Sequence, residues 1–214
     1  MKFCVIGLGR LGYQLATVLA DNGMEVMAID SNESIVASIR DQVTQAICMR
    51  VTDEASLRSI GIEEMDTVIV AMGENFAQSI LITALLKKRL AIPNVIARAI
   101  NEIHKDILKL VGADRIVLPE KEVGTRLADT LSSPFTDLTR LNKEFSISKI
   151  RAPQPFIGHT AESLGIFKNY NVHCIGIEES VDHITPIGAD HIIQENDRLI
   201  VAGKNSDLEK LAKL

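Results

Sequence analysis

The chain contains no tryptophan, only 4% aromatic residues and three cysteines in 214 residues. A core poor in aromatic rings must be built mainly from aliphatic side chains, which are plentiful because 46% of the residues are hydrophobic. Cys4, Cys48 and Cys174 lie far apart and follow no metal-ligand spacing, so neither a zinc site nor a redox pair is expected. Since Cys4 and Cys48 fall in apolar runs, we expect both thiols to be buried.

The sequence also lacks an excess of basic residues. Its net charge of -5 and isoelectric point of about 5.6 argue against a nucleic-acid partner, which would favour a basic face. Met1 leads directly into a strand-like run, so no signal peptide is expected. The most apolar helical segment, residues 76–86, is too short to cross a bilayer. We therefore expect a cytoplasmic protein that reaches the inner face of a membrane only through a partner.

Recognisable catalytic groups are missing as well. There is no Tyr-x-x-x-Lys pair, no nucleophile elbow and no phosphate loop ending in Gly-Lys-Ser/Thr. Of the five histidines, only His104 lies in the first half, on a helix that we expect to be exposed. His183 and His191 have no further metal-ligand residues at a suitable spacing. These absences argue that the protein is not an enzyme.

Strand-like and helix-like segments alternate regularly over the first 131 residues. Short apolar runs predict six strands, at residues 3–6, 25–29, 46–49, 67–71, 94–98 and 115–118. Helical spacing predicts helices at residues 11–22, 31–40, 53–60, 75–90 and 102–111, and a further helix that begins at Pro119. This alternation predicts an α/β fold with a Rossmann-like, doubly wound, parallel six-stranded sheet.

The pattern changes after about residue 131. Residues 132–134 resemble a turn, and the following segments are short. They predict strands at 146–150, 172–177, 192–193 and 198–202, a turn at 178–182, and helices at 160–164 and 207–214. We therefore expect an N-terminal domain of residues 1–132, a linker at 133–143 and a small α+β domain at 144–214. A domain of about 70 residues is small enough for association to contribute to its stability.

A Gly-x-Gly-x-x-Gly motif at residues 7–12 predicts a nucleotide site. It follows the first strand and opens a helix, and Asp30 ends the second strand close to the expected spacing of about 20 residues. Gly7 permits the tight turn, Gly9 lets a phosphate approach the backbone, and Gly12 lets helix and strand pack closely. Asp30 would accept hydrogen bonds from ribose hydroxyls and would repel a 2′-phosphate. The alternatives are a glycine turn without a ligand and an aspartate that caps the next helix.

Two charged residues favour a phosphate ligand. Arg10 begins a helix, where a cation opposes the helix dipole unless an anion lies nearby. Glu120 follows Pro119 in another first turn and would face the phosphates, directly or through a divalent cation. The plainer interpretations are that Arg10 points into water and that Glu120 compensates the dipole of its own helix.

The motifs together resemble one family. The segments 5–12, 28–30 and 112–121 (Gly-Ala-Asp-Arg-Ile-Val-Leu-Pro-Glu-Lys) are similar to those of RCK proteins, the regulator-of-potassium-conductance subunits of bacterial Ktr and Trk potassium uptake systems. The resemblance continues from about residue 144 to the end, including Asp-Arg-Leu-Ile-Val-Ala-Gly at 197–203. It implies a Rossmann-like domain followed by an RCK C-terminal domain.

The resemblance also implies a ligand and site residues. Family members bind ATP or ADP, and some bind NAD or NADH, so these are the expected ligands, with Mg²⁺ held through the phosphates at Glu120. Arg10 would reach the terminal phosphate and Asp30 the ribose, and residues at the other strand ends would line the pocket. The candidate binding residues are Gly7, Gly9, Arg10, Leu11, Gly12, Asp30, Ser31, Arg50, Thr52, Ala71, Gly73, Arg98 and Glu120.

The expected partners follow from the same resemblance. Such subunits dimerise by exchanging the helix at about residues 120–131, assemble into an octameric ring and dock on a potassium-translocating membrane subunit. The sequence departs from the family at Arg50, where relatives often carry Asn or Asp. It also has no arginine in residues 166–172, which leaves cyclic di-AMP binding without its expected contact.

The leading hypothesis is a nucleotide-binding regulatory subunit that gates potassium transport. Two other interpretations remain open from the residues alone: a small NAD-dependent oxidoreductase, and a nucleotide sensor that acts on another partner.

Overall fold

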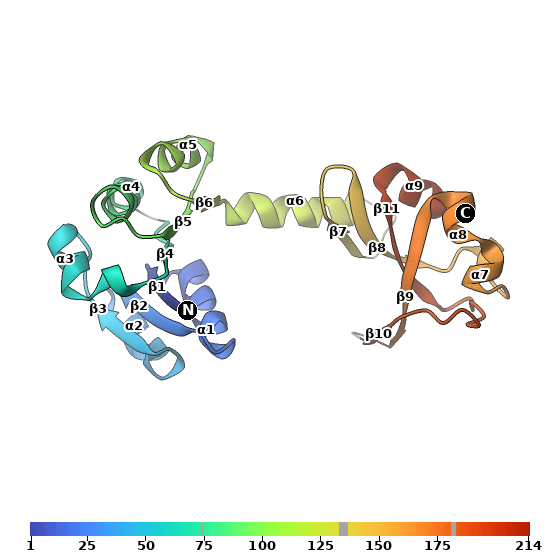
Figure 1. The fold of residues 1–214 in the computed structure, drawn as a ribbon, viewed down its shortest axis with the longest axis horizontal. Coiled ribbons are helices and arrows are strands. Elements are labelled where there is room, and N and C mark those ends of the chain that lie inside the picture. Colours follow the sequence, from blue (N-terminus) through green and yellow to red (C-terminus); the bar gives the residue numbers. More distant parts are fainter. Residues whose placement is uncertain (74, 133–136, 181–182) are drawn as a thin grey trace. The chain divides into compact units, whose positions relative to one another are not determined.

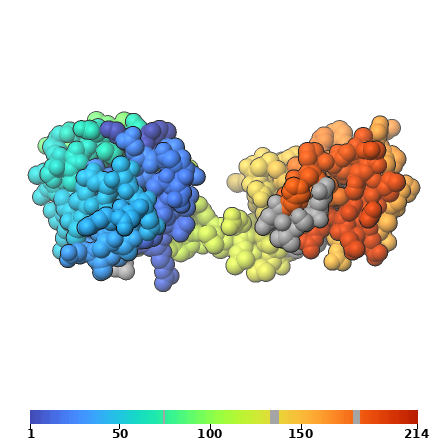
Figure 2. Space-filling view, turned by 90° about the horizontal axis from the view of Figure 1, so that it is seen from below, coloured from blue at the N-terminus to red at the C-terminus, as the bar shows by residue number. Residues whose placement is uncertain are grey.

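The computed structural model describes residues 1–73, 75–132, 137–180 and 183–214 (Figure 1). The chain divides into two compact units, Met1–Glu122 and Val123–Leu214. In the space-filling view each unit is a closely packed body (Figure 2). Among the described residues, no helix combines the length and apolar character needed to cross a bilayer.

The first unit is built on a six-stranded parallel sheet, as the sequence predicts. Its strands are β1 (Lys2–Ile6), β2 (Glu25–Asp30), β3 (Gln45–Cys48), β4 (Thr67–Val70), β5 (Asn94–Arg98) and β6 (Arg115–Val117). They lie in the order β3-β2-β1-β4-β5-β6, and every neighbouring pair is parallel. The chain thus winds outward in both directions from the centre, which is the Rossmann-like, doubly wound arrangement.

Helices cover both faces of this sheet (Figure 1). They are α1 (Arg10–Asp21), α2 (Glu33–Ile39), α3 (Glu54–Ser59), α4 (Phe76–Ala84) and α5 (Glu102–Val111), with 3-10 turns η1 (Arg40–Gln42) and η2 (Ile62–Glu64) and a π-helical turn η3 (Leu85–Arg89). Neighbouring residues of a strand point to opposite faces, so Val5 packs with α1 and α2 whereas Cys4 and Ile6 pack with α3, α4 and α5. The result is two aliphatic cores.

The thiol predictions are half correct. Cys4 is fully buried, and burial raises the pKa of its thiol. Cys48 is exposed, contrary to expectation, because it ends β3, the edge strand, where only one neighbouring strand is present. Its Sγ lies 3.8 Å from the carbonyl oxygen of Ser31. An apolar run at the sheet edge therefore does not bury its last residue.

The second unit contains an antiparallel five-stranded sheet. Its strands are β7 (Asp137–Arg140), β8 (Phe145–Arg151), β9 (Val172–Ser180), β10 (His183–Thr185) and β11 (Arg198–Lys204), in the order β10-β9-β11-β8-β7. The helices are α7 (Ala161–Leu164), α8 (Ile166–Tyr170) and α9 (Asn205–Leu211), with the 3-10 turn η4 (Gln154–Phe156). A separate core forms around Phe156, Leu199 and Leu208, which confirms the small α+β domain.

Several local expectations for the second unit need correction. Residues 137–140, assigned to a linker, form β7, because they pair with β8 across the Asn142 turn. Residues 178–180, expected in a turn, extend β9. Residues 192–193 do not form a strand; Ile192 makes only an isolated bridge with Thr160. The predicted turn at 132–134 and the end of the turn at 178–182 fall partly outside the described residues.

The helix α6 (Pro119–Ser132) begins directly after β6, and the boundary between the two units falls within it. None of its residues is buried. Val123, Leu127 and Leu131 are 57%, 57% and 78% exposed and recur every four residues, so they form one apolar stripe. A solvent-exposed apolar stripe of this kind is typical of a helix that packs against another chain.

Candidate functional site

The candidate residues of the first unit gather at one edge of the parallel sheet. All six strands run in the same direction, so their carboxyl ends share an edge. The connections from β1 and β4 leave in opposite directions there, and this is the point where open α/β sheets bind ligands. The strand ends and following turns supply the glycine loop after β1, Asp30 after β2, Arg50 and Thr52 after β3, Ala71 and Gly73 after β4, Arg98 in β5 and Glu120 after β6.

The glycine loop has the geometry that its sequence predicts. Gly7 adopts a φ of +93°, and its N–H donates to Ile29 O at 2.8 Å. A Cβ on Gly12 would overlap the carbonyl oxygen of Gly7 and lie 3.1 Å from Ala71 Cβ. By contrast, no atom of another part of the protein lies within 4 Å of a Cβ built on Gly9. Gly7 and Gly12 are therefore needed for the fold, and Gly9 leaves open space in front of α1.

The N-terminus of α1 can receive an anion. Gly9 precedes the helix and has no side chain to cap it, and no acidic residue occupies the first turn. The first N–H groups of the helix therefore point into the open space with the positive end of the helix dipole behind them. This is the arrangement that binds phosphate in dinucleotide folds.

Asp30 forms hydrogen bonds within the protein and can also accept hydrogen bonds from a ligand. Its Oδ2 accepts a hydrogen bond from the N–H of Leu8 at 2.6 Å, and its Oδ1 accepts one from the N–H of Asn32 at 2.8 Å. Each carboxylate oxygen can accept a second bond, so the side chain retains capacity for ribose hydroxyls. The plainer role, capping the next helix, belongs to Asn32, whose Oδ1 accepts from the N–H of Ser34 at 3.0 Å.

Arg98, at the end of β5, and Glu120, after β6, form an ion pair at the same carboxyl edge of the sheet. Arg98 Nη2 lies 2.5 Å from Glu120 Oε1, and the guanidinium lies against Gly73, where a Cβ would overlap Nη1. The pKa of Glu120 lies below its usual value because its carboxylate accepts a hydrogen bond from its own backbone N–H and pairs with Arg98. The sequence predicts both residues in the pocket but does not indicate that they pair.

The remaining candidates are mostly open to solvent. Arg10, Ser31, Arg50 and Thr52 are exposed, Leu11 is half-buried, and Arg10 forms no ion pair within the described part of the chain. In the described part of the chain Arg50 forms no ion pair either, so both arginines bring positive charge to this edge of the sheet. Ala71 is buried, and its N–H donates to Ile6 O at 2.8 Å. Its Cβ lies close to Gly12, so Ala71 acts through packing.

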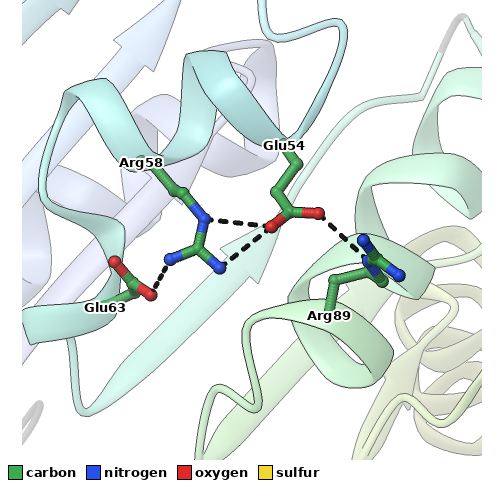
Figure 3. Close-up of polar contacts among 4 residues, drawn as sticks. All are labelled: Glu54, Arg58, Glu63 and Arg89. Carbon is green, nitrogen blue, oxygen red and sulfur yellow. Dashed lines mark hydrogen bonds and ion pairs between the residues drawn. The ribbon is translucent and has the colours of Figure 1, made fainter.

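An ion-pair network joins α3 to η2 and η3 (Figure 3). Glu54, in the first turn of α3, accepts from Arg58 Nε at 2.9 Å and from Arg89 Nε of η3 at 3.1 Å, and Arg58 also pairs with Glu63. These contacts lower the pKa of Glu54, with Arg58 as the main cause. Because solvent screens these largely exposed charges, the pairs add little stability.

The prediction for His104 is wrong. This residue is fully buried rather than exposed, its ring lies 4.4 Å from that of Phe76, and burial lowers its pKa. Its Nδ1 lies 3.4 Å from the N–H of Ile100, in the turn that follows Arg98. The sequence does carry the signal, because His104 and Leu108 are four residues apart and share the inner face of α5.

Taken together, these groups fit a nucleoside phosphate or a dinucleotide. The helix N-terminus and the arginines suit phosphates, and Asp30 suits a ribose. Within the described ranges, no group of three or more His, Cys, Asp or Glu side chains is arranged to hold a metal ion. A cation at Glu120 would therefore depend on the nucleotide for its other ligands.

Comparisons with known proteins agree with the fold and identify the family. The TrkA-N domain model matches residues 3–119, and the TrkA-C domain model matches residues 146–214. The chain is 35% identical to Ktr system potassium uptake protein C of Bacillus subtilis over 213 residues, which cover 99% of this chain and 96% of that protein. It is also 35% identical to Ktr system potassium uptake protein A of the same organism, over 98% of this chain and 94% of that protein.

Solved structures give the same fold. The GsuK channel bound to NAD aligns with a TM-score of 0.68 at 18% identity, over 99% of this chain and 39% of that chain. GsuK bound to ADP aligns with a TM-score of 0.53 at 26% identity, over 61% of this chain and 33% of that chain. This chain thus spans less than half the length of the channel chains that it matches.

Proposed function

Because this chain belongs to the TrkA-N and TrkA-C family, as an RCK regulatory subunit of Ktr/Trk-type potassium uptake, we propose that it binds ATP and ADP at the carboxyl edge of its parallel sheet and thereby gates a potassium-translocating membrane subunit. The observation that carries the proposal is the glycine loop before α1, with Asp30 on one side and Arg98 on the other. ATP and ADP would stabilise different conformations of the assembly, so that the ratio of ATP to ADP sets the populations of these conformations. The subunit would lie at the inner face of the membrane, held there by its partner.

Two observations bear on the identity of the nucleotide: the charge of Asp30, and the GsuK channel, which has been solved with ADP and with NAD. GsuK, which is 26% identical to this chain over the aligned region, has been solved bound to ADP. Asp30 disfavours a 2′-phosphate, because two negative charges would meet at the ribose. NAD or NADH remains the alternative ligand of the same crevice. Mg²⁺, if bound with ATP, would be held by the phosphates and Glu120.

Arg10 provides a test of phosphate recognition. It is exposed and has no ion-pair partner among the described residues, so Arg10→Ala should leave the fold intact. If the guanidinium reaches the terminal phosphate, the substitution should weaken ATP binding about tenfold and ADP binding much less. Calorimetric titration with both nucleotides measures the two losses. Arg40→Ala, which removes an exposed arginine of η1, serves as the control. Equal losses for ATP and ADP would contradict a terminal-phosphate role.

Self-association would use the apolar stripe of α6. A helix with no buried residue and three exposed aliphatic side chains is suited to exchange with a second copy, and further copies would complete an octameric ring. Leu127→Asp places a charge in the middle of this stripe and should shift the assembly to smaller species in light scattering, because a buried unpaired charge is costly. Thr125→Asp adds the same charge to the opposite side of the helix and should leave the size unchanged. Equal effects of both variants would contradict the stripe as an interface.

Potassium-dependent growth tests the function as a whole. A bacterial strain without its own potassium uptake systems is supplied with a Ktr-type membrane subunit, alone or together with this chain. The proposal predicts that growth at low potassium improves when the chain is present. The gain should be lost with Gly9→Ala, which changes the loop without any clash inside the protein. Growth that is indifferent to the chain would contradict the gating role.

A further inference from the structure

The side chain of Arg98 is held between Gly73, after β4, and Glu120, after β6. Its guanidinium occupies the space beside Gly73 that a Cβ would fill, and its Nη2 contacts Glu120 Oε1 at 2.5 Å. The Arg98 side chain is 19% exposed and the Glu120 side chain is 68% exposed. The arginine is therefore fixed by its surroundings. The glutamate is held by the contact of its carboxylate with Arg98 and can move into solvent when that contact is lost.

The hydrogen bonding of Arg98 is incomplete. Within the described part of the chain, its buried Nε has no hydrogen-bond partner. A guanidinium has five N–H donors in a planar fork, and a phosphate group offers more acceptor oxygens and more negative charge than one carboxylate oxygen. A phosphate at the carboxyl edge of the sheet would therefore compete with Glu120 for Arg98, and its charge would also repel the carboxylate.

Glu120 belongs to an element with few other attachments. It lies in the first turn of α6, whose residues are not buried. Among the described residues, two other side chains of this turn make contacts outside it: Lys121 pairs with Glu102 of α5, and Glu122 Oε1 accepts from the N–H of Leu118 at 3.3 Å. The boundary between the two units follows immediately, after Glu122. Loss of the Arg98–Glu120 contact should therefore increase the mobility of the first turn of α6.

We propose that the Arg98–Glu120 pair is a latch through which nucleotide occupancy controls the start of α6. Without nucleotide, Arg98 holds Glu120 and the first turn of α6 is fixed. Nucleotide phosphates take the place of the Glu120 carboxylate on Arg98, and the turn is released. Glu120 thereby acts as a positioning residue, and the signal leaves the site along the helix that joins the two units. This inference rests on the nucleotide binding proposed above.

Hydrogen–deuterium exchange of the full chain, with ADP as the probe in EDTA, tests the latch. In the wild-type protein, ADP should increase exchange of the backbone amides in the segment 119–126, where every residue except Pro119 has an N–H. In Glu120→Gln, exchange of these amides should already be high without nucleotide, and ADP should add nothing. Because the competing charge is gone, this variant should bind ADP about threefold to tenfold more tightly.

Glu122→Gln is the matched control. It removes the same charge from the same turn, and its amide oxygen can still accept from the N–H of Leu118. It should retain wild-type ADP affinity and the ADP-dependent exchange. A second variant, Gly73→Ala, displaces Arg98 from its position and should give high exchange at residues 119–126 without nucleotide.

Three results would overturn the latch while leaving nucleotide binding intact. They are unchanged exchange at residues 119–126 in wild type saturated with ADP, a persistent ADP effect in Glu120→Gln, and weaker ADP binding by Glu120→Gln in EDTA. The last would mean that the carboxylate helps to hold the nucleotide. If the wild-type chain binds neither ATP nor ADP, the proposed function fails instead, and the two failures are thus distinguishable.

Discussion

Gly12→Ala should abolish nucleotide binding and lower stability, whereas Gly9→Ala should abolish binding alone. A Cβ at position 12 would overlap the carbonyl oxygen of Gly7 and press on Ala71, so α1 could no longer lie against the sheet. Overpacking of this kind costs about 1–3 kcal/mol. At position 9 the backbone has an ordinary φ of -65° and the Cβ would meet no neighbouring part of the protein, so the unfolding free energy should change by less than about 1 kcal/mol.

The two glycines therefore separate folding from binding. For both variants we expect ATP and ADP affinity to fall by about a hundredfold or more, since the displaced loop or the added methyl group keeps phosphate from the helix N-terminus. Thermal unfolding measures the first effect and calorimetry the second. If Gly9→Ala binds nucleotide as the wild type does, the phosphates do not lie over this loop.

Asp30→Ala should have the second largest effect, on both stability and binding. The Leu8 N–H loses its acceptor at 2.6 Å, and an unsatisfied, partly buried donor costs about 1–3 kcal/mol. The loop is then untied from β2 and the ribose loses its carboxylate, so nucleotide affinity should fall by about tenfold or more. Denaturant unfolding and calorimetric titration measure the two losses.

Asp30→Asn distinguishes the two roles of the side chain. The amide oxygen can still accept from the N–H of Leu8, so most of the stability should return. The amide cannot accept on both sides as a carboxylate does, so nucleotide binding should recover only in part. Full affinity in Asp30→Ala would contradict contact between this residue and the nucleotide.

The first unit could be predicted from the sequence because its signals are local. Parallel strands buried on both faces appear as continuous apolar runs, and Asn32, Asp53 and Asn101 cap helices close to the predicted starts. The glycine loop and Asp30 have local signals for the same reason, since both stand at strand ends, whereas Arg98 is expected in the site only from the family resemblance.

Features that depend on distant partners could not be predicted. The Arg98–Glu120 pair joins residues from different strand ends, and Cys48 is exposed only because β3 lies at the edge of the sheet. In the second unit, β7 and the end of β9 carry weak local patterns and are defined by pairing with β8 and β10. His104 was expected to be exposed because a polar residue usually faces solvent, although its helical position is an inner one.

The most direct test of the account is calorimetric titration of the full chain with ATP and with ADP, combined with light scattering of the same samples. We predict that both nucleotides bind one multimeric species and that their affinities differ, because a subunit that senses their ratio must distinguish them. Failure of both nucleotides to bind, identical affinities, or a monomer throughout the titration would contradict the account.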